Sequence, residues 1–179
     1  MKPQILMSVF AIFCTALYAD SFFERLFEKK DGSIKVAQHI KDRLYIKECG
    51  SCHFAYQPEF LPSRSWKKIV SNLEDHFGTD ASLESEDLES IEEFLITNAG
   101  DKTELKAKKF ALSSDRGDIP VRITDLPYFK KEHKEIDKNA VKNEKIKSFA
   151  NCSACHTDAA PGLYEEKAIV IPGYGRWED

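Results

Sequence analysis

The stretches Cys49-Gly50-Ser51-Cys52-His53 and Cys152-Ser153-Ala154-Cys155-His156 decide the fold of this chain, because both follow the pattern Cys-x-x-Cys-His. Two thiols at this spacing reach the two vinyl groups of one porphyrin and form thioether bonds with it. The histidine that follows then lies under the iron and supplies an axial nitrogen. Each stretch therefore predicts one covalently attached haem c. The expected attachment residues are Cys49, Cys52, Cys152 and Cys155, and the expected proximal ligands are His53 and His156.

Three other roles compete for these four cysteines. They could bind one zinc ion, form disulfides or act as redox-active thiols. None of these roles explains why a histidine follows the second cysteine in both motifs. Two complete motifs in one exported chain therefore favour haem.

The N-terminus has the pattern of a secretory signal peptide over residues 1–19. Lys2 precedes an apolar run from Ile5 to Tyr18, and Ala19 ends the segment before a charged stretch. The run is shorter than the roughly 20 residues that a bilayer span needs. An uncleaved anchor is the alternative, because Leu17 occupies a position where cleavage sites carry a small residue. We expect a mature chain of residues 20–179 in the periplasm.

The second axial position of each iron has few candidate ligands in the mature chain. Both methionines, Met1 and Met7, belong to the signal segment, so the usual methionine ligand is missing. The histidines outside the two motifs are His39, His76 and His133. His39 stands among charged residues and is interpreted as a solvated side chain, although it is the natural substitute if another candidate fails.

Helical spacing favours His76 and His133 as the distal ligands. His76 follows Trp66 and Leu73 on the apolar face of a helical pattern that runs over residues 63–77. His133 lies four positions after Phe129 within a pattern over residues 124–136, where Pro127 suits a first helical turn. A buried histidine with an ordinary core role is the alternative for each of them.

The sequence does not decide which two of the four histidines bind the same iron. The same interval separates His53 from His76 and His133 from His156, which favours local pairs. A crossed arrangement, in which a distal histidine reaches the other haem, is the alternative.

Composition and charge exclude some functions. The chain has 179 residues, 42% of them hydrophobic and 31% charged, with a formal net charge of −4, so it lacks the basic character of a nucleic-acid binder. Asp80 to Glu93 holds seven acidic residues and no basic one, whereas Lys130 to Lys147 holds seven lysines against four acids. These segments are either solvated helix faces, which we favour, or patches that steer redox partners.

The pattern along the chain predicts a mainly α fold with two haem-binding lobes of short helices and loops, over about 36–112 and 113–179. Helices are expected at residues 36–48, 63–77, 85–98 and 139–151, and a short strand at 168–171. The protein part of the core looks thin, so two haems would supply buried apolar surface. The candidate haem-packing residues are Trp66, Phe77, Phe129 and Phe149.

With these residues placed, the sequence resembles the small dihaem cytochrome c family from about Leu44 to Gly173. The stretches around His76 and His133 are more specific than the cysteine motifs alone. The matching stretches are Glu48 to His53, Tyr56-Gln57-Pro58, Leu61-Pro62, Ser65-Trp66, Asp75-His76-Phe77-Gly78, Asp80 to Leu83, Arg122-Ile123-Thr124, Leu126-Pro127, Phe129, Glu132-His133, Asn151 to His156 and Ile171-Pro172-Gly173.

The resemblance implies two low-spin haems c, each with two histidines on its iron, and electron transfer in the periplasm. It also implies a membrane b-type cytochrome as one partner and, in some relatives, a small oxygen-binding haem protein as the other. Neither nucleic acid nor a small-molecule substrate is expected. The alternative is a small haem reductase or peroxidase, or a gas-binding protein, with one open haem site.

Overall fold

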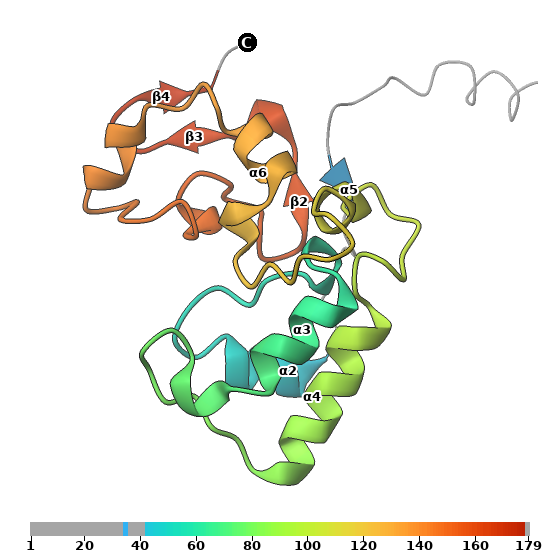
Figure 1. The fold of residues 1–179 in the computed structure, drawn as a ribbon. Coiled ribbons are helices and arrows are strands. Elements are labelled where there is room, and N and C mark those ends of the chain that lie inside the picture. Colours follow the sequence, from blue (N-terminus) through green and yellow to red (C-terminus); the bar gives the residue numbers. More distant parts are fainter. Residues whose placement is uncertain (1–33, 36–41, 178–179) are drawn as a thin grey trace, which may run out of the picture. The chain divides into compact units, whose positions relative to one another are not determined.

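The computed structural model describes residues 34–35, by their backbone alone, and residues 42–177. The predicted signal peptide and His39 lie outside these residues. Helices and turns make up most of the described chain, and strands are confined to two short pairs (Figure 1). The expectation of a mainly α fold is therefore confirmed. No helix of the described part is both long and apolar enough to span a membrane.

Five α-helices and several short 3₁₀ helices follow one another along the part of the chain that the structure describes. The α-helices are α2 (Arg43–Cys49), α3 (Ser63–Val70), α4 (Ser85–Thr97), α5 (Lys108–Leu112) and α6 (Pro127–Glu132). The 3₁₀ turns are η1 (Pro58–Phe60), η2 (Leu73–Asp75), η3 (Ile123–Asp125), η4 (Lys138–Lys142), η5 (Cys152–Ala154) and η6 (Glu166–Ala168).

The strands form two antiparallel pairs. Strand β1 (Ile34–Lys35) pairs with β2 (Leu163–Tyr164), so two segments far apart in sequence lie side by side. Strand β3 (Val170–Ile171) pairs with β4 (Gly175–Arg176) as a hairpin. The turn between β3 and β4 contains Gly173 at φ 87°, a backbone conformation that glycine adopts without steric strain. The short strand predicted at residues 168–171 is thus confirmed for Val170–Ile171, whereas Ala168 ends a 3₁₀ helix.

The main hydrophobic core lies where α3 and α2 pack against α4. Ile91 and Leu95, four positions apart on α4, are buried against Trp66 and Val70 of α3. The indole of Trp66 also donates a 2.8 Å hydrogen bond to the carbonyl of Pro58, so its polar atom is satisfied inside the core. The helix predicted over residues 85–98 is confirmed and ends at Thr97.

The helix predicted over residues 63–77 is shorter than expected. Helix α3 ends at Val70, because Ser71 and Asn72 turn their side chains back to the backbone. Such local hydrogen bonds compete with helical ones. His76 therefore lies in a turn after η2 rather than on a continuous helix.

The prediction of a helix over residues 139–151 is wrong. Only the 3₁₀ turn η4 forms there, and the chain then runs through turns. Asn143 and Asn151 bind backbone groups of this segment through their side chains, and Lys147 has a left-handed φ of 60°. Asparagine side chains that bond to nearby backbone groups favour turns over helix, and periodic apolar residues did not outweigh them.

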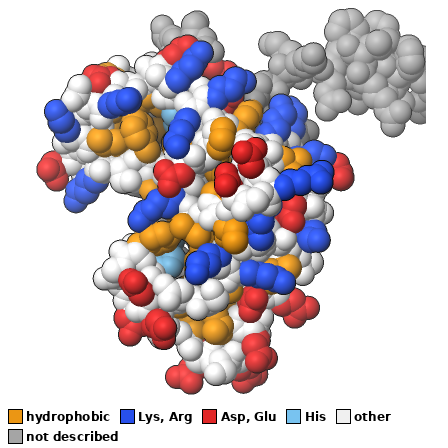
Figure 2. Space-filling view, viewed as in Figure 1, with side chains coloured by type: hydrophobic (Ala, Val, Ile, Leu, Met, Phe, Trp, Pro, Cys, Tyr) orange, Lys and Arg blue, Asp and Glu red, His pale blue; other side chains and the backbone are white. Residues whose placement is uncertain are grey.

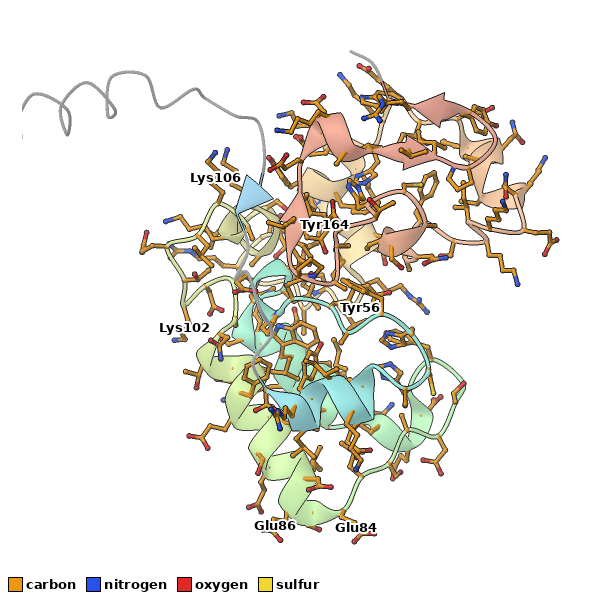
Figure 3. The ribbon with its side chains drawn as sticks, turned by 180° about the vertical axis from the view of Figure 1, so that it is seen from behind. Tyr56, Glu84, Glu86, Lys102, Lys106 and Tyr164 are labelled. Atoms are coloured by element: carbon orange, nitrogen blue, oxygen red, sulfur yellow. The ribbon has the colours of Figure 1, made fainter. Side chains whose placement is uncertain are left out.

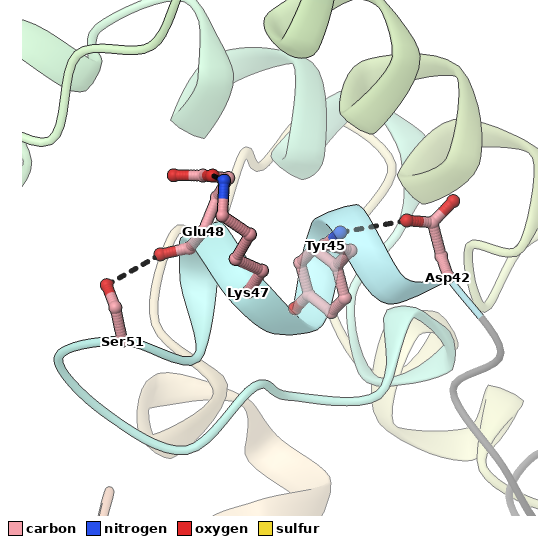
Figure 4. A network of polar contacts seen from close by, with 5 residues as sticks. All are labelled: Asp42, Tyr45, Lys47, Glu48 and Ser51. Atoms are coloured by element: carbon pink, nitrogen blue, oxygen red, sulfur yellow. Dashed lines mark hydrogen bonds and ion pairs between the residues drawn. The ribbon is translucent and has the colours of Figure 1, made fainter.

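The helix predicted over residues 36–48 begins later than expected. Asp42 is the N-cap of α2, and its carboxylate accepts a 2.8 Å hydrogen bond from the backbone N–H of Tyr45 (Figure 4). An aspartate in this position starts a helix rather than continuing one. Residues 36–41 lie outside the described part of the chain.

A second, smaller hydrophobic cluster surrounds the second cysteine motif. Only Ala140, Ile146 and Ile171 are buried in it, and Cys155 packs against them. Leu126 and Phe129, in contrast, belong to the main core. The division into lobes at residues 112 and 113 remains a prediction.

Candidate haem-binding sites

The first cysteine motif begins in the last turn of α2. Cys49 is half-buried there, and Cys52 and His53 are exposed. A Cβ atom at Gly50 would collide with the carbonyl oxygen of Ile46, so only glycine lets the chain leave the helix at this point. The hydroxyl of Ser51 donates a 2.8 Å hydrogen bond to a carbonyl of the same helix and closes the turn (Figure 4).

A tight turn presents His76 to the first motif. The backbone of His76 exchanges hydrogen bonds of 2.9 and 3.2 Å with Thr79. Between them Phe77 and Gly78 have φ angles of 56° and 92°, and the carboxylate of Asp75 accepts a hydrogen bond from the N–H of Gly78. The sequence Asp-His-Phe-Gly thus forms a closed turn that carries the half-buried imidazole of His76.

The structure brings His53 and His76 together. Their ring centroids lie 6.1 Å apart, and the two ring planes are inclined by 19°. The two ligands that the sequence predicts for the first iron therefore lie next to each other. The attachment cysteines belong to the same motif as His53.

The second cysteine motif lies on η5 and the turn after it. The backbone N–H of His156 donates a 2.8 Å hydrogen bond to the carbonyl of Cys152. The carbonyl of Cys155 accepts a 3.1 Å hydrogen bond from Val170, and His156 pairs with Ile169 in an isolated bridge. The C-terminal hairpin thereby holds the motif in place.

His133 caps the C-terminal end of α6 and lies next to His156. Their ring centroids are 6.2 Å apart, and their planes are inclined by 73°. The ring of His133 stacks on Phe129, with centroids 3.9 Å apart. The second pair of predicted ligands is thus also local, so the structure has no crossed arrangement of the four rings.

The separation within each pair suits an iron atom between the rings. An imidazole nitrogen binds a metal at about 2 Å and the ring centre lies about 1 Å further, so two imidazoles on opposite sides of one iron have centres about 6 Å apart. Both pairs have this separation, although they are built by unrelated turns.

Hydrogen bonds orient two of the four rings. Nδ1 of His53 lies 2.7 Å from the carbonyl oxygen of Phe54, and Nδ1 of His133 lies 2.9 Å from that of Phe129. Because a carbonyl only accepts, each Nδ1 donates its proton and Nε2 keeps its lone pair. An imidazole of this tautomer is ready to bind a metal through Nε2.

The surroundings of three histidines favour the neutral imidazole that metals bind. Burial lowers the pKa of His76, and His53 and Arg122 lower it further. Burial also lowers the pKa of His133, against the opposing effect of its hydrogen bond to Phe129. For His156, burial and the neighbouring His133 lower the pKa to about 4. These rings remain neutral at pH 7 and available as ligands.

The cysteines fit the competing roles poorly. All four are free thiols, and no group of three or more metal-binding side chains gathers anywhere in the described chain, so they do not meet around one zinc ion. Burial raises the pKa of Cys49 and of Cys152 to about 11. A thiol with such a pKa stays protonated and is a poor nucleophile, which argues against a redox-active role for these two cysteines. A thioether bond to haem carries no charge and is therefore compatible with their burial.

Large apolar side chains stay exposed around the histidine pairs. Phe77 is 48% exposed beside His76, Ile46 is 44% exposed on α2, and Val170 is 40% exposed beside the second motif. Figure 2 shows a histidine surface next to an apolar patch in both halves of the molecule. Exposed apolar surface of this kind marks a site for an apolar partner, and a porphyrin would cover it.

The four candidate haem-packing residues have different surroundings. Phe129 stacks on His133, and Phe77 contacts His76 with ring centroids 4.8 Å apart. Trp66 and Phe149 instead pack with the main core. Only two of the four therefore touch a candidate ligand.

Sequence reasoning assigned no role to two tyrosines that contact candidate ligands. Tyr56 lies beside His53 with centroids 5.2 Å apart, and Tyr164 lies beside His156 at 5.3 Å. Figure 3 labels both tyrosines. The position of Tyr56, three residues after His53, was a signal that could have pointed to it, whereas nothing near Tyr164 marks it.

The two charged segments are exposed, as either interpretation requires. Glu84 and Glu86 project at the start of α4 (Figure 3), and the lysines of residues 130–147 are all exposed. The choice between solvated faces and partner-steering patches stays a prediction.

Comparisons with known proteins agree on one family. A family model described as dihaem cytochrome c matches residues 45–164. A solved dihaem cytochrome c from Rhodobacter sphaeroides is 38% identical, with a TM-score of 0.65, and the match covers 70% of this chain and 98% of that one. The X-ray structure of a dihaem cytochrome c from Shewanella baltica OS155 is 36% identical, with a TM-score of 0.63 over 76% of this chain and 97% of that one. No curated protein matches.

Proposed function

Because this chain belongs to the dihaem cytochrome c family, we propose that it is a periplasmic electron carrier whose two haems c are each bound by two histidines. Its cofactors are two haems c with their iron. The proposed attachment residues are Cys49, Cys52, Cys152 and Cys155. The proposed iron ligands are His53, His76, His133 and His156.

The observation that carries the proposal is the spacing of the rings in both histidine pairs, 6.1 and 6.2 Å between centroids. Each pair combines the histidine of a cysteine motif with one from a separate turn. Its separation is that of two axial imidazoles on one iron.

Haem iron supplies one-electron chemistry by cycling between its ferric and ferrous states. The four histidines would occupy both coordination sites outside the porphyrin plane of each iron and so leave none for a substrate. The hydrogen bonds of His53 and His133 to backbone carbonyls hold these two rings in a fixed orientation, which would keep the reorganisation that accompanies electron transfer small.

The proposed partners follow from the family. They are a membrane b-type cytochrome, which would donate electrons, and a periplasmic acceptor, for which the small oxygen-binding haem protein implied for some relatives is one candidate. Export by the N-terminal segment, with cleavage near Ala19, would deliver the chain to the compartment where haem c is attached.

The first test is an optical one. Spectra of the exported protein are recorded oxidised, reduced with dithionite and reduced under carbon monoxide, and the haem is counted by the pyridine haemochrome method. We expect two haems per chain with low-spin bands that carbon monoxide leaves unchanged. A large shift for one haem would overturn the proposal, because it would reveal an open iron and favour a reductase, a peroxidase or a gas-binding protein.

A further inference from the structure

A buried amide joins the segment of the first haem to the segment of the second. Gln57 follows His53 by four positions, and its side chain is fully buried. Its Nε2 donates a 2.7 Å hydrogen bond to the carbonyl of Ala159, and its Oε1 accepts a 2.6 Å hydrogen bond from the hydroxyl of Tyr164. Both ends of this amide are thus used by residues more than one hundred positions away.

Tyr164 transmits this contact to the second pair of histidines. Its ring lies beside that of His156, with centroids 5.3 Å apart, and its other neighbour is the buried ring of Phe60 at 5.5 Å. The hydroxyl of Tyr164 donates the 2.6 Å hydrogen bond to Oε1 of Gln57, and this bond holds the tyrosine ring in place.

The imidazole of His156 is held in place differently from that of His53, the histidine of the first motif. Nδ1 of His53 is anchored on a backbone carbonyl, whereas the buried Nδ1 of His156 has no hydrogen-bond partner among the described residues. The ring of His156 is thus restrained by packing, and Tyr164 supplies part of that packing. A change that loosens Tyr164 would let the imidazole move and let water reach Nδ1.

We propose that Gln57 is a positioning residue for the second haem, which it reaches through Tyr164 and His156, although it belongs to the segment of the first haem. The proposal rests on the proposed function, since it takes His156 as an iron ligand. In this arrangement Gln57 holds Tyr164 against His156, excludes water from that imidazole and keeps the potential of the second haem high.

The direction of the effect follows from burial and hydrogen bonding. Water near an iron site stabilises the more highly charged ferric state, and a hydrogen bond to Nδ1 makes the imidazole a stronger donor to ferric iron. Both effects lower the potential. Loss of Gln57 should therefore lower the potential of the second haem and leave that of the first unchanged.

The experiment compares Gln57→Leu and Tyr164→Phe in the full chain with both haems attached. Each change removes the Gln57–Tyr164 hydrogen bond, and Tyr164→Phe keeps the ring. The readouts are the midpoint potentials of both haems, the low-spin ferric electron paramagnetic resonance signals, which identify each haem by its ring angle, and the urea midpoint.

We expect the partition of one electron between the haems to change about tenfold towards the first haem, which corresponds to about 59 mV for a one-electron couple. The double variant should shift no further than the larger single variant, because both changes remove the same Gln57–Tyr164 hydrogen bond. If Gln57→Leu does not mature with two haems, Tyr164→Phe decides alone.

Tyr45→Phe is the matched control. It removes a partly buried 2.7 Å hydrogen bond from a tyrosine hydroxyl to the carbonyl of Tyr56, and the ring of Tyr45 packs on Phe94 rather than on a candidate ligand of the second haem. It should lower stability without moving the potential of that haem. Unchanged potentials in both test variants, with two low-spin haems present, would overturn the inference and leave the proposed function intact. Fewer than two low-spin haems in the unaltered chain would instead overturn the proposed function.

Discussion

The proton on a single ring nitrogen prepares a histidine for iron. In His53 and His133 that proton points to a backbone carbonyl of the same turn, at residue Phe54 in one case and Phe129 in the other. The second nitrogen is therefore free and its direction is set before any metal binds. This is why we treat His133 as a ligand rather than an ordinary core histidine.

His133→Ala should open one of the two irons. Removal of this imidazole leaves His156 as the remaining imidazole of the second pair, so we expect carbon monoxide to bind one of the two haems in the reduced protein. Added imidazole should restore the six-coordinate spectrum, because it can occupy the space left by the side chain. Optical titration with carbon monoxide measures both effects.

His39→Ala is the control for that experiment. The sequence interpretation makes His39 a solvated side chain, so its removal should leave both haems closed to carbon monoxide. Binding of carbon monoxide to His39→Ala but not to His133→Ala would show that the distal ligand had been assigned to the wrong histidine.

The angle between paired rings predicts two different paramagnetic signals. The planes of His53 and His76 are inclined by 19°, whereas those of His133 and His156 are inclined by 73°. Nearly parallel imidazoles split the iron orbitals rhombically, and nearly perpendicular ones leave them close to degenerate. We expect one rhombic low-spin ferric signal and one strongly anisotropic signal at low temperature. Two identical rhombic signals would contradict the geometry of the second pair.

At the scale of elements, helix α3 depends on a cap from outside its own segment. Position 62 is a proline and offers no side-chain acceptor. Asp101 takes this role, because its carboxylate accepts 2.7 Å hydrogen bonds from the N–H and from the hydroxyl of Ser63. Partial burial acts in the opposite direction, but these hydrogen bonds lower the pKa of Asp101.

Asp101→Asn should destabilise the protein at neutral pH by about 1 kcal/mol, because the amide has one acceptor oxygen where the carboxylate has two, so one of the two hydrogen bonds to Ser63 is lost together with the charge. Because the folded-state pKa is lowered, the stabilisation is present above the unfolded pKa of about 3.9 and is lost as the pH falls through the folded pKa. Urea unfolding of both proteins from pH 7 to pH 3 should therefore show a difference that shrinks with acid.

Asp118→Asn is the control, since this exposed aspartate caps no helix. It should leave the urea midpoint at neutral pH unchanged. An Asp101→Asn difference that stays constant down to pH 3 would mean that the carboxylate charge has no part in the cap.

Local patterns predicted some elements well and others poorly. The helix Ser85–Thr97 and the strand Val170–Ile171 depend on residues within one segment, and an element of the right type was predicted at both places. The segment 139–151 failed, because asparagine side chains capture its backbone and its neighbours hold it in turns. The spacing of apolar residues alone does not show when side-chain hydrogen bonds to the backbone replace helical ones.

At the scale of the whole molecule, the two cysteine motifs have unequal support. The main core buries a dozen side chains, among them Trp66 and Leu95, whereas the cluster at the second motif buries only Ala140, Ile146 and Ile171. Burial of apolar surface is the main source of stability. We therefore expect the second haem to supply a larger share of the apolar contacts around its motif than the first haem supplies around the other.

Removal of each haem should consequently have a different effect. We expect Cys152→Ala with Cys155→Ala, which prevents attachment of the second haem, to abolish hydrogen-exchange protection over residues 136–177 and to leave α4 protected. Cys49→Ala with Cys52→Ala should leave protection in α4 and in the C-terminal hairpin. Hydrogen exchange followed by mass spectrometry measures both variants.

Equal loss of protection in α4 in the two double variants would contradict this expectation. It would mean that both haems stabilise one cooperative unit. The buried Gln57 bridge would then be the first contact to test as its cause.

The sequence by itself determined the cofactor, the attachment cysteines as candidates and the mainly α character. These properties depend on covalent spacing within five residues or on periodicity within one segment, so a local pattern carries them. The family assignment also needs no structure, because it rests on stretches of matching residues.

Only the tertiary structure decided which histidine faces which, how each ring is turned and what holds it. The ring pairs, the carbonyl acceptors at His53 and His133 and the contact from Gln57 to Tyr164 join residues that turns and packing bring together. Such contacts depend on where several segments meet in space. No local sequence pattern specifies these contacts, because each segment alone could pack against several other segments of the chain.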